Sequence, residues 1–304
     1  MRQLVSTITS EGKLELSIAT KDKPEPKDDE VLIRAEASPI NPSDLGAMFG
    51  PADMATAEAA GSTDNPITIA KVPAHLMQSV AARVGKAVPL GIEGAGIVEK
   101  AGSSAAAQAL TGKTVALMGG AMYAEYRTAK ADQCLLMHDG TTPAEAASCF
   151  VNPLTVLGMV ETMRMEGHTA LVHTAAASNF GQMLNKLCIN EGIDIVKIVR
   201  RQQHVDLLRS LGAGYVCDST LATFNADLVE ALMATKATLA FDAVGRGNLA
   251  AEILSAMEIA QARSGAAIGA YGSTIHEQVY IHGALDRSPT QIGRAFGMAW
   301  GVGG

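Results

Sequence analysis

The chain has 304 residues, which is room for about two domains of roughly 150 residues each. Hydrophobic residues make up 48% and charged residues 18%, a composition typical of a folded protein with a sizeable core and unlike that of a disordered chain. The net charge of −7 argues against nucleic acid or an anionic membrane as the main partner, and we expect neither.

The four cysteines are scattered, at Cys134, Cys149, Cys188 and Cys217. They form no C-x-x-C pair and have no nearby histidine in the sequence, so we expect reduced thiols and no metal site. We find no apolar stretch of the ~18 residues that a membrane span needs, and no signal-peptide pattern at the start. These features together predict a cytoplasmic protein.

The first part of the chain, residues 1–140, is predicted to be mostly β. Short segments rich in β-branched residues occur at 31–37, 97–99 and 114–118, with turn signals between them. An Ala-rich insertion at about 50–88 interrupts this pattern. We expect that insertion to be a surface excursion, part loop and part helix.

From residue 141 strands and helices alternate, beginning with a helix opened by Thr142 and Pro143. Because parallel strands need long crossovers, six strands separated by helices predict a doubly wound α/β domain over residues 141–286. The predicted strands lie at 170–174, 193–199, 215–217, 238–242, 266–270 and 278–282, and the helices between the first five at about 181–191, 203–211, 223–235 and 248–259.

The turn after the first of these strands is the predicted cofactor site. A doubly wound sheet binds ligands beyond the carboxyl ends of its strands, and small residues there let the backbone approach a pyrophosphate. Of a full G-x-G-x-x-G pattern only the last glycine is present, and an ordinary tight turn is the alternative interpretation. The residues assigned to the pyrophosphate are Ala177, Ser178, Asn179, Phe180 and Gly181.

The end of the second strand indicates which dinucleotide is preferred. A site for NAD usually has an acidic side chain there, whereas this chain has Arg200 and Arg201. Guanidinium groups suit a 2′-phosphate, and two arginines at a helix start are otherwise unfavourable. We therefore predict NADP(H) as cofactor, with a solvated basic pair as the alternative.

Short motifs over nearly the whole chain resemble the zinc-free quinone oxidoreductases of the medium-chain dehydrogenase/reductase family. The resemblance implies a GroES-like, partly open β-barrel domain followed by the nucleotide-binding (Rossmann) domain, with the substrate in the cleft between them. The motifs are INPSD at 40–44, GIEGAG at 91–96, AEY at 124–126, NPLT at 152–155, AAASNFG at 175–181, LGA at 211–213 and FDAVG at 241–245.

The same resemblance implies hydride transfer from NADPH to a quinone or another α,β-unsaturated carbonyl, without zinc. It makes Asn41 and Thr155, beside the nicotinamide, the candidate catalytic residues. It also implies cofactor contacts from Asn152 and Thr155 and from the fourth and fifth strand ends, at Val244, Gly245, Tyr271 and Gly272.

Some positions depart from the family pattern. Ser178 and Asn179 stand where a Gly-Gly pair is common, Gly46 stands where several members have a tyrosine, and no zinc ligands are present at Asn41 or Ile92. Glu93 is expected to serve packing or hydrogen bonding. Residues 287–304 are expected to start a return to the first domain, with a chain end that is incomplete or unusually short.

Two other functions fit the same residues: an NADP(H)-binding sensor or scaffold with little turnover, and an enoyl-thioester reductase. The sequence provides no convincing proton donor; His173 is interpreted as a satisfied core residue, and Tyr271 and Ser273 are weak candidates. A homodimer is expected if residues 278–283 form an edge strand that pairs across a two-fold axis.

Overall fold

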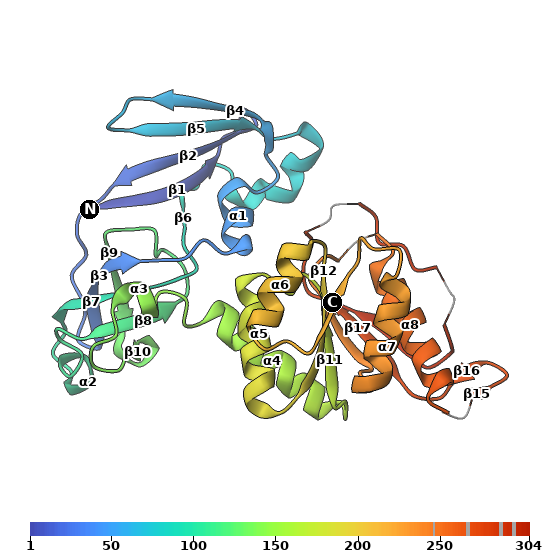
Figure 1. Ribbon diagram of the computed structural model, residues 1–304. Coiled ribbons are helices and arrows are strands. Elements are labelled where there is room, and N and C mark those ends of the chain that lie inside the picture. Colours follow the sequence, from blue (N-terminus) through green and yellow to red (C-terminus); the bar gives the residue numbers. More distant parts are fainter. Residues whose placement is uncertain (246, 266–267, 286–287, 294–295) are drawn as a thin grey trace. The chain divides into compact units, whose positions relative to one another are not determined.

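The computed structural model describes residues 1–304 except 246, 266–267, 286–287 and 294–295 (Figure 1). By its internal contacts the chain divides into two compact units, Met1–Val151 and Asn152–Gly304. Figure 1 colours the first unit from blue to green and the second from green to red.

The first unit consists of two antiparallel sheets, each of five strands, in the orders β4-β5-β2-β1-β6 and β10-β8-β7-β3-β9. The three strands predicted at 31–37, 97–99 and 114–118 are present as β3, β7 and β8. The elements are β1 (Arg2–Ile8), β2 (Lys13–Thr20), β3 (Glu30–Ala37), α1 (Pro42–Phe49), β4 (Asp53–Gly61), β5 (Pro66–Lys71), the 3-10 helix η1 (Ala74–Arg83), β6 (Val88–Pro89), β7 (Glu93–Ala101), α2 (Ala105–Gln108), β8 (Thr114–Met118), β9 (Tyr126–Lys130), the 3-10 helix η2 (Ala131–Gln133), β10 (Leu135–Leu136) and α3 (Pro143–Ala146).

The insertion at about 50–88 differs from the expectation of loop and helix. Its first half is a β-hairpin, because β4 pairs with β5 and β5 pairs with β2. The alanines that suggested a helix lie on β4, where pairing with Ile67 and Ile69 of β5 outweighs their intrinsic helix preference. The second half contains η1. The insertion therefore extends the first sheet by two strands.

The second unit is built around a six-stranded, fully parallel sheet. Its strands and helices alternate as predicted, and most bounds differ from prediction by one or two residues. The elements are α4 (Val151–Met165), β11 (Ala170–His173), α5 (Asn179–Glu191), β12 (Asp194–Val199), α6 (Gln202–Ser210), β13 (Tyr215–Asp218), α7 (Phe224–Thr235), β14 (Leu239–Asp242), α8 (Leu249–Arg263), β15 (Ile268–Gly269), β16 (Gly272–Ser273), β17 (Glu277–Ile281) and β18 (Trp300–Gly303).

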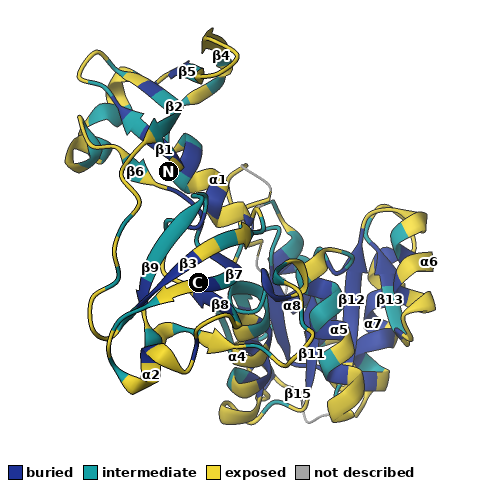
Figure 2. Ribbon diagram, turned by 90° about the vertical axis from the view of Figure 1, so that its left-hand side faces the viewer, coloured by how far each residue is buried: buried dark blue, intermediate teal, exposed yellow. Residues whose placement is uncertain are grey.

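The strand order β13-β12-β11-β14-β17-β18 is the order 3-2-1-4-5-6 of a dinucleotide-binding sheet. Figure 1 shows α4, α5 and α6 on one face of this sheet and α7 and α8 on the other. Successive residues of one strand face opposite layers: Leu171 packs with α4 and α5, and Val172 packs with α7 and α8. The strands are therefore buried on both sides (Figure 2), and the predicted fold class is confirmed.

The prediction that residues 266–270 form the fifth strand of this sheet is wrong. Residues 266–267 lie outside the described residues, and β15 pairs antiparallel with β16 in a separate two-stranded hairpin. The sheet instead gains β18, although residues 287–304 were expected to begin a return to the first domain. Because β18 pairs with β17, the segment 278–283 is not the edge of the sheet, contrary to the dimerisation argument.

One described stretch, Pro143–Met165, has the length and the mean hydropathy (1.2) that a membrane crossing requires. The sequence analysis had found none. The stretch comprises α3 and α4, and a third of its apolar window is buried. In the structure α4 packs Val156, Met159 and Val160 against the sheet, so these apolar positions contribute to the protein core.

Two ionisable side chains are buried side by side in the second unit, His173 on β11 and Lys197 on β12. Among the described residues, the Lys197 ammonium donates only to the carbonyl of Ile195, at 3.3 Å. Burial lowers the pKa of Lys197 from 10.5 to about 8. Neither ring nitrogen of His173 has a hydrogen-bond partner among the described residues, so the expectation of a satisfied histidine is wrong. Burial, with His282 and Lys197 nearby, lowers the pKa of His173 to about 3. As a neutral ring, His173 stacks on His282 and packs at a tilt against Phe180.

We predict that Lys197→Met raises the free energy of unfolding by about 1–3 kcal/mol at pH 7, because it removes a poorly paired buried charge while keeping the side-chain volume. The folded pKa lies below the unfolded value, so the wild-type penalty is full below pH 8 and disappears as pH rises towards 10.5. Urea unfolding at pH 7, 8, 9 and 10 measures the difference between the variants, which should shrink with pH. Lys186→Met, at an exposed position of α5, is the control; an equal effect there would contradict the prediction.

Candidate nucleotide site and the first-unit polar network

The turn between β11 and α5 is shaped by Ser178. Its side-chain oxygen accepts a hydrogen bond from the backbone N–H of Gly181 at 3.1 Å, which makes Ser178 the N-cap of α5. The helix therefore starts at Asn179, and its remaining first-turn N–H groups create positive potential beyond the strand ends. An anion can be held there by backbone alone.

Two backbone positions explain the reduced glycine pattern. A Cβ at Gly181 would lie 2.3 Å from the carbonyl oxygen of Ala176, so the close approach of α5 to the preceding turn requires glycine here. Ala175 has a φ of 51°, a left-handed conformation that favours glycine, yet it carries a side chain. Asn179, which stands at a position where the family commonly has glycine, is the first residue of the helix. No sequence signal marked Ala175, because alanine rarely takes this conformation.

A buried carboxylate joins the ends of the two strands where the sheet order reverses. Asp242, at the end of β14, accepts a hydrogen bond from the Thr174 hydroxyl at 2.7 Å. The same hydroxyl accepts from the N–H of Ala243 at 2.8 Å, and Asp242 also accepts from the N–H groups of Val244 and Gly245 at 2.9 and 3.1 Å. Thr174 and Asp242 thus shape the loops on both sides of the crevice. The sequence analysis had assigned no role to either residue.

A pocket of about 610 Å³ lies at these strand ends. It unites five residues predicted to bind the cofactor: Ala177, Ser178, Arg200, Arg201 and Val244. Sequence reasoning missed the others, although Ser219 directly follows a strand end and could have been found by that rule. The further lining residues are Thr174, Ala175, Ile198, Val199, His204, Ser219, Gly247, Asn248, Leu249, Glu252 and Leu285.

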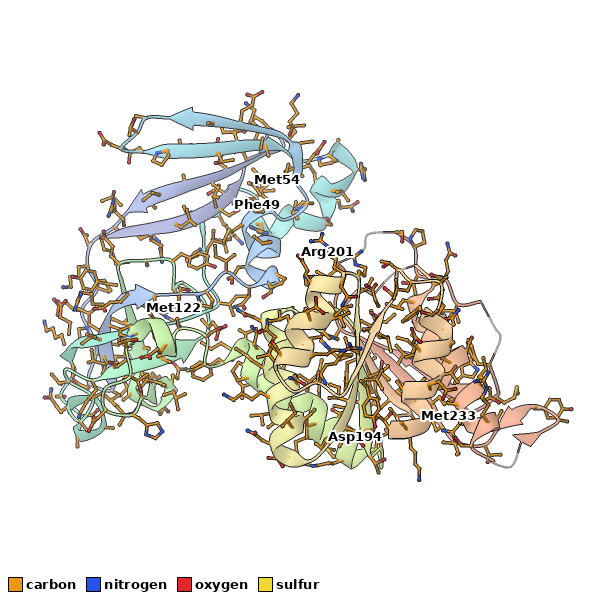
Figure 3. All side chains as sticks on the ribbon, in the orientation of Figure 1. Phe49, Met54, Met122, Asp194, Arg201 and Met233 are labelled. Atoms are coloured by element: carbon orange, nitrogen blue, oxygen red, sulfur yellow. The ribbon has the colours of Figure 1, made fainter. Side chains whose placement is uncertain are left out.

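The charges of the pocket favour an anion. Arg200 and Arg201 are exposed, and within the described part of the chain neither forms an ion pair. Figure 3 shows Arg201 and Asp194 at opposite ends of β12, with Arg201 at the carboxyl end. The acid in the lining, Glu252, accepts a hydrogen bond from the Asn248 side chain at 2.7 Å. Both guanidinium groups are therefore available to a ligand.

The remaining predicted contacts lie elsewhere. Asn179, Phe180 and Gly181 form the first turn of α5 behind the pocket lining, and Gly245 follows Val244 in the β14 loop. Tyr271, which is 78% exposed, and Gly272 belong to the β15–β16 hairpin, where Gly272 packs against Glu258 of α8. Ser273 is buried there and donates its N–H to Glu258 at 2.8 Å. The hairpin contributes no residue to the pocket.

The two candidate catalytic residues lie in different units. Thr155 is exposed on α4, with Asn152 one turn before it, and neither lines the pocket. Asn41 belongs to the first unit, at the start of α1, and is 4% exposed. Its surroundings can be described from that unit alone.

The amide of Asn41 is fixed by Glu93, which is fully buried at the start of β7. The Asn41 Nδ2 group donates to Glu93 Oε1 at 2.9 Å, while Glu93 Oε2 accepts from the N–H groups of Phe150 and Val151 at 2.9 and 3.0 Å. Asp44 accepts from the N–H of Asn41 at 2.8 Å and of Ile92 at 2.9 Å. The expectation that Glu93 serves hydrogen bonding is therefore confirmed.

The described residues contain no group of three or more His, Cys, Asp or Glu side chains that could hold a metal ion. The cysteines are free thiols. Burial raises the pKa of Cys134 and Cys188 to about 11 and that of Cys217 to about 12. These three thiols are therefore protonated near neutral pH.

Comparison with known proteins gives the family. Residues 27–139 match the alcohol dehydrogenase GroES-like domain. The whole chain is similar to the crystal structure of a protein designated an NADPH:quinone reductase from Mesorhizobium loti, with 27% identity, a TM-score of 0.66, and coverage of 96% of this chain and 76% of that one. These similarities support the medium-chain dehydrogenase/reductase family and, within it, the quinone oxidoreductase-like branch.

More distant members share the fold. The Escherichia coli quinone oxidoreductase complexed with NADPH is 16% identical, with a TM-score of 0.65 and coverage of 96% of this chain and 76% of that one. The CurK enoyl reductase is also 16% identical, with a TM-score of 0.64 and coverage of 93% and 75%. Over 122 residues the chain is 32% identical to a highly reducing polyketide synthase from Cryptosporiopsis sp. (strain 8999), a match that spans 40% of this chain and 5% of the synthase.

The backbone of the nucleotide turn makes a paired prediction. Gly181→Ala should lower the free energy of unfolding by about 1–3 kcal/mol, because the new Cβ collides with the backbone of Ala176. Ala175→Gly should leave it unchanged or raise it by up to about 1 kcal/mol, because it relieves a left-handed alanine. Denaturant unfolding of both variants is the measurement. Equal destabilisation by the two substitutions would show that the turn has another conformation.

Proposed function

We propose that the protein is an oxidoreductase that binds NADP(H) in the pocket at the carboxyl ends of β11, β12 and β14. The observation that carries this proposal is that Arg200 and Arg201, which form no ion pair with any described residue, lie in one pocket with a helix N-terminus at the point where the strand order reverses. A pyrophosphate and a 2′-phosphate both fit this arrangement of donors and charges. The related Escherichia coli enzyme was crystallised with NADPH, which supports the choice of cofactor.

The pocket residues have separate roles in this proposal. The backbone of Ala177 to Gly181 holds the pyrophosphate, and Arg200 and Arg201 hold the 2′-phosphate through charge-assisted hydrogen bonds. The loop at Val244 and Gly245, held by Asp242, borders the cofactor farther along the crevice. Bound NADPH supplies the hydride, and the protein contributes binding and orientation.

The substrate class that we propose is a quinone or another α,β-unsaturated carbonyl, reduced without a metal ion. It rests on the branch of the family to which the chain belongs and on the names of its solved relatives. Asn41 and Thr155 are the proposed catalytic residues, with Asn152 beside the cofactor. Glu93 orients the Asn41 amide by accepting its Nδ2 hydrogen bond.

An enoyl-thioester reductase is the second candidate. It is supported by the likeness to the CurK enoyl reductase and, more loosely, by the short match to a polyketide synthase. Both reactions add hydride to a carbon conjugated with a carbonyl group, so the nucleotide pocket serves either. The acceptor alone distinguishes them.

The direct test is turnover. We expect the purified protein to oxidise NADPH when 1,4-benzoquinone or a simple enone is the acceptor. The loss of absorbance at the reduced-nicotinamide band measures this oxidation. An enoyl thioester in the same panel tests the second candidate. If NADPH binds, as a change in its fluorescence would show, but no acceptor causes oxidation, the protein is a sensor or scaffold and the proposed activity is wrong.

The arginine pair is tested by cofactor preference. Arg200→Gln and Arg201→Gln should each weaken NADPH binding by about 10-fold or more, because each removes a charged hydrogen-bond donor, while NADH binding changes little. Titration calorimetry with both cofactors gives the ratio. Arg209→Gln, at the other end of α6 and outside the pocket, is the matched control. An unchanged NADPH-to-NADH ratio in both pocket variants would rule out a 2′-phosphate role.

A further inference from the structure

The inserted segment at 50–88 contacts helix α1, whose N-cap is Asn41. Helix α1 has eight residues, including Gly46 in its interior, and no basic residue in its last turn. A helix of this length is not stable by itself in water. Its position must therefore be held by groups at its two ends and by packing.

The N-terminal end is held by the network around Asp44 and Glu93. Asp44 is 1% exposed and accepts from the N–H of Ile92, while Glu93 accepts from the Asn41 amide. These bonds tie the first turn of α1 to the segment that leads into β7. They fix the start of the helix but leave its last turn free.

The C-terminal end is held by Arg83, the last residue of η1 in the inserted segment. Its Nη2 group donates to the carbonyl of Ala47 at 3.0 Å. The Ser6 hydroxyl donates to the carbonyl of Met48 at 2.8 Å, and the N–H of Gly50 donates to the carbonyl of Gly46 at 2.9 Å. Three carbonyl groups at the end of α1 are thus satisfied, one of them by a cation at the negative end of the helix dipole.

The backbone at Gly50 is shaped to admit the arginine. Gly50 has a φ of 49° and a ψ of −133°, a combination that glycine adopts readily and that residues with a side chain avoid. A Cβ at this position would lie 3.3 Å from the Arg83 Nη1 atom. The guanidinium therefore lies directly over the end of the helix.

The inserted segment itself is anchored. Met77, Val80 and Val84 pack against a buried cluster that includes Ile8 and Leu14 of the first sheet. The hairpin β4–β5 extends the same sheet through its pairing with β2. Arg83 therefore extends from a segment that is packed in place. We call this support of the last turn of α1 by the segment and Arg83 the brace.

We propose that Arg83 is a positioning residue for Asn41, and that the inserted segment supports α1 so that the Asn41 amide keeps its orientation on Glu93. The role in catalysis rests on the proposed function; the role in holding α1 does not. Arg83 acts through the helix, because its bonds are to the last turn and Asn41 precedes the first.

The test compares Arg83→Met, Arg83→Lys and the control Lys71→Met, which removes an exposed cation from the same segment. In Arg83→Met the N–H of Gly50 should exchange with solvent about 10-fold faster, and the NMR signals of the Asn41 side-chain amide should shift or broaden. With a quinone acceptor, kcat should fall about 10-fold while the KM for NADPH changes less than twofold. Arg83→Lys should restore most of the exchange protection and rate.

The possible outcomes separate the support of α1 from the positioning of Asn41. Unchanged exchange at Gly50 and unchanged Asn41 signals in Arg83→Met would overturn the brace. Altered signals with an unchanged kcat would overturn the positioning role while leaving the brace. If the wild-type protein reduces no acceptor, the proposed function is wrong. The exchange of the Gly50 N–H and the NMR signals of the Asn41 amide then still test whether Arg83 supports α1. Loss of folding in Arg83→Met would be recognised from its whole spectrum, and Arg83→Lys would then provide the comparison.

Discussion

The hydrogen bond between the Thr174 hydroxyl and the buried carboxylate of Asp242 holds two strand ends together beside the proposed nucleotide pocket. It joins the ends of two strands, β11 and β14, at the place where connections leave the sheet in opposite directions. Both of its partners also hold backbone N–H groups of the loop that follows β14. The carboxylate of Asp242 accepts three hydrogen bonds, from the Thr174 hydroxyl and from the N–H groups of Val244 and Gly245. Because these bonds satisfy a buried charge, they stabilise the loops on both sides of the crevice.

Electrostatics in the second unit separate the pocket from the interior. At the strand ends, Arg200 and Arg201 are exposed and keep their charges for a ligand. Within β11 and β12, His173 and Lys197 are buried, and burial favours the neutral form of both side chains. The basic residues on these strands and after them therefore differ in their exposure. The exposed arginines can bind an anion, whereas the buried histidine and lysine cannot.

The first unit uses carboxylates as acceptors for backbone and amide groups. Glu93 and Asp44 together receive hydrogen bonds from Asn41, Ile92, Phe150 and Val151. Such a network gives a short, glycine-containing helix a defined start, and Arg83 from the insertion gives it a defined end. The insertion at 50–88, which the sequence analysis expected to be a surface excursion, is thereby connected to the candidate catalytic asparagine.

The sequence by itself determined the alternation of strands and helices after residue 141, the position of the turn between β11 and α5, and the basic pair after β12. These features depend on local periodicity, caps and strand ends, which a short window of residues contains. Tertiary structure decided the rest. Pairing with β5 made a strand of an Ala-rich segment, pairing with β17 placed Trp300–Gly303 in the sheet, and Ala175 took a left-handed conformation that alanine rarely adopts. Asp242 and Arg83 gained their roles from residues 68 and 36 positions away, and no local pattern records such distances.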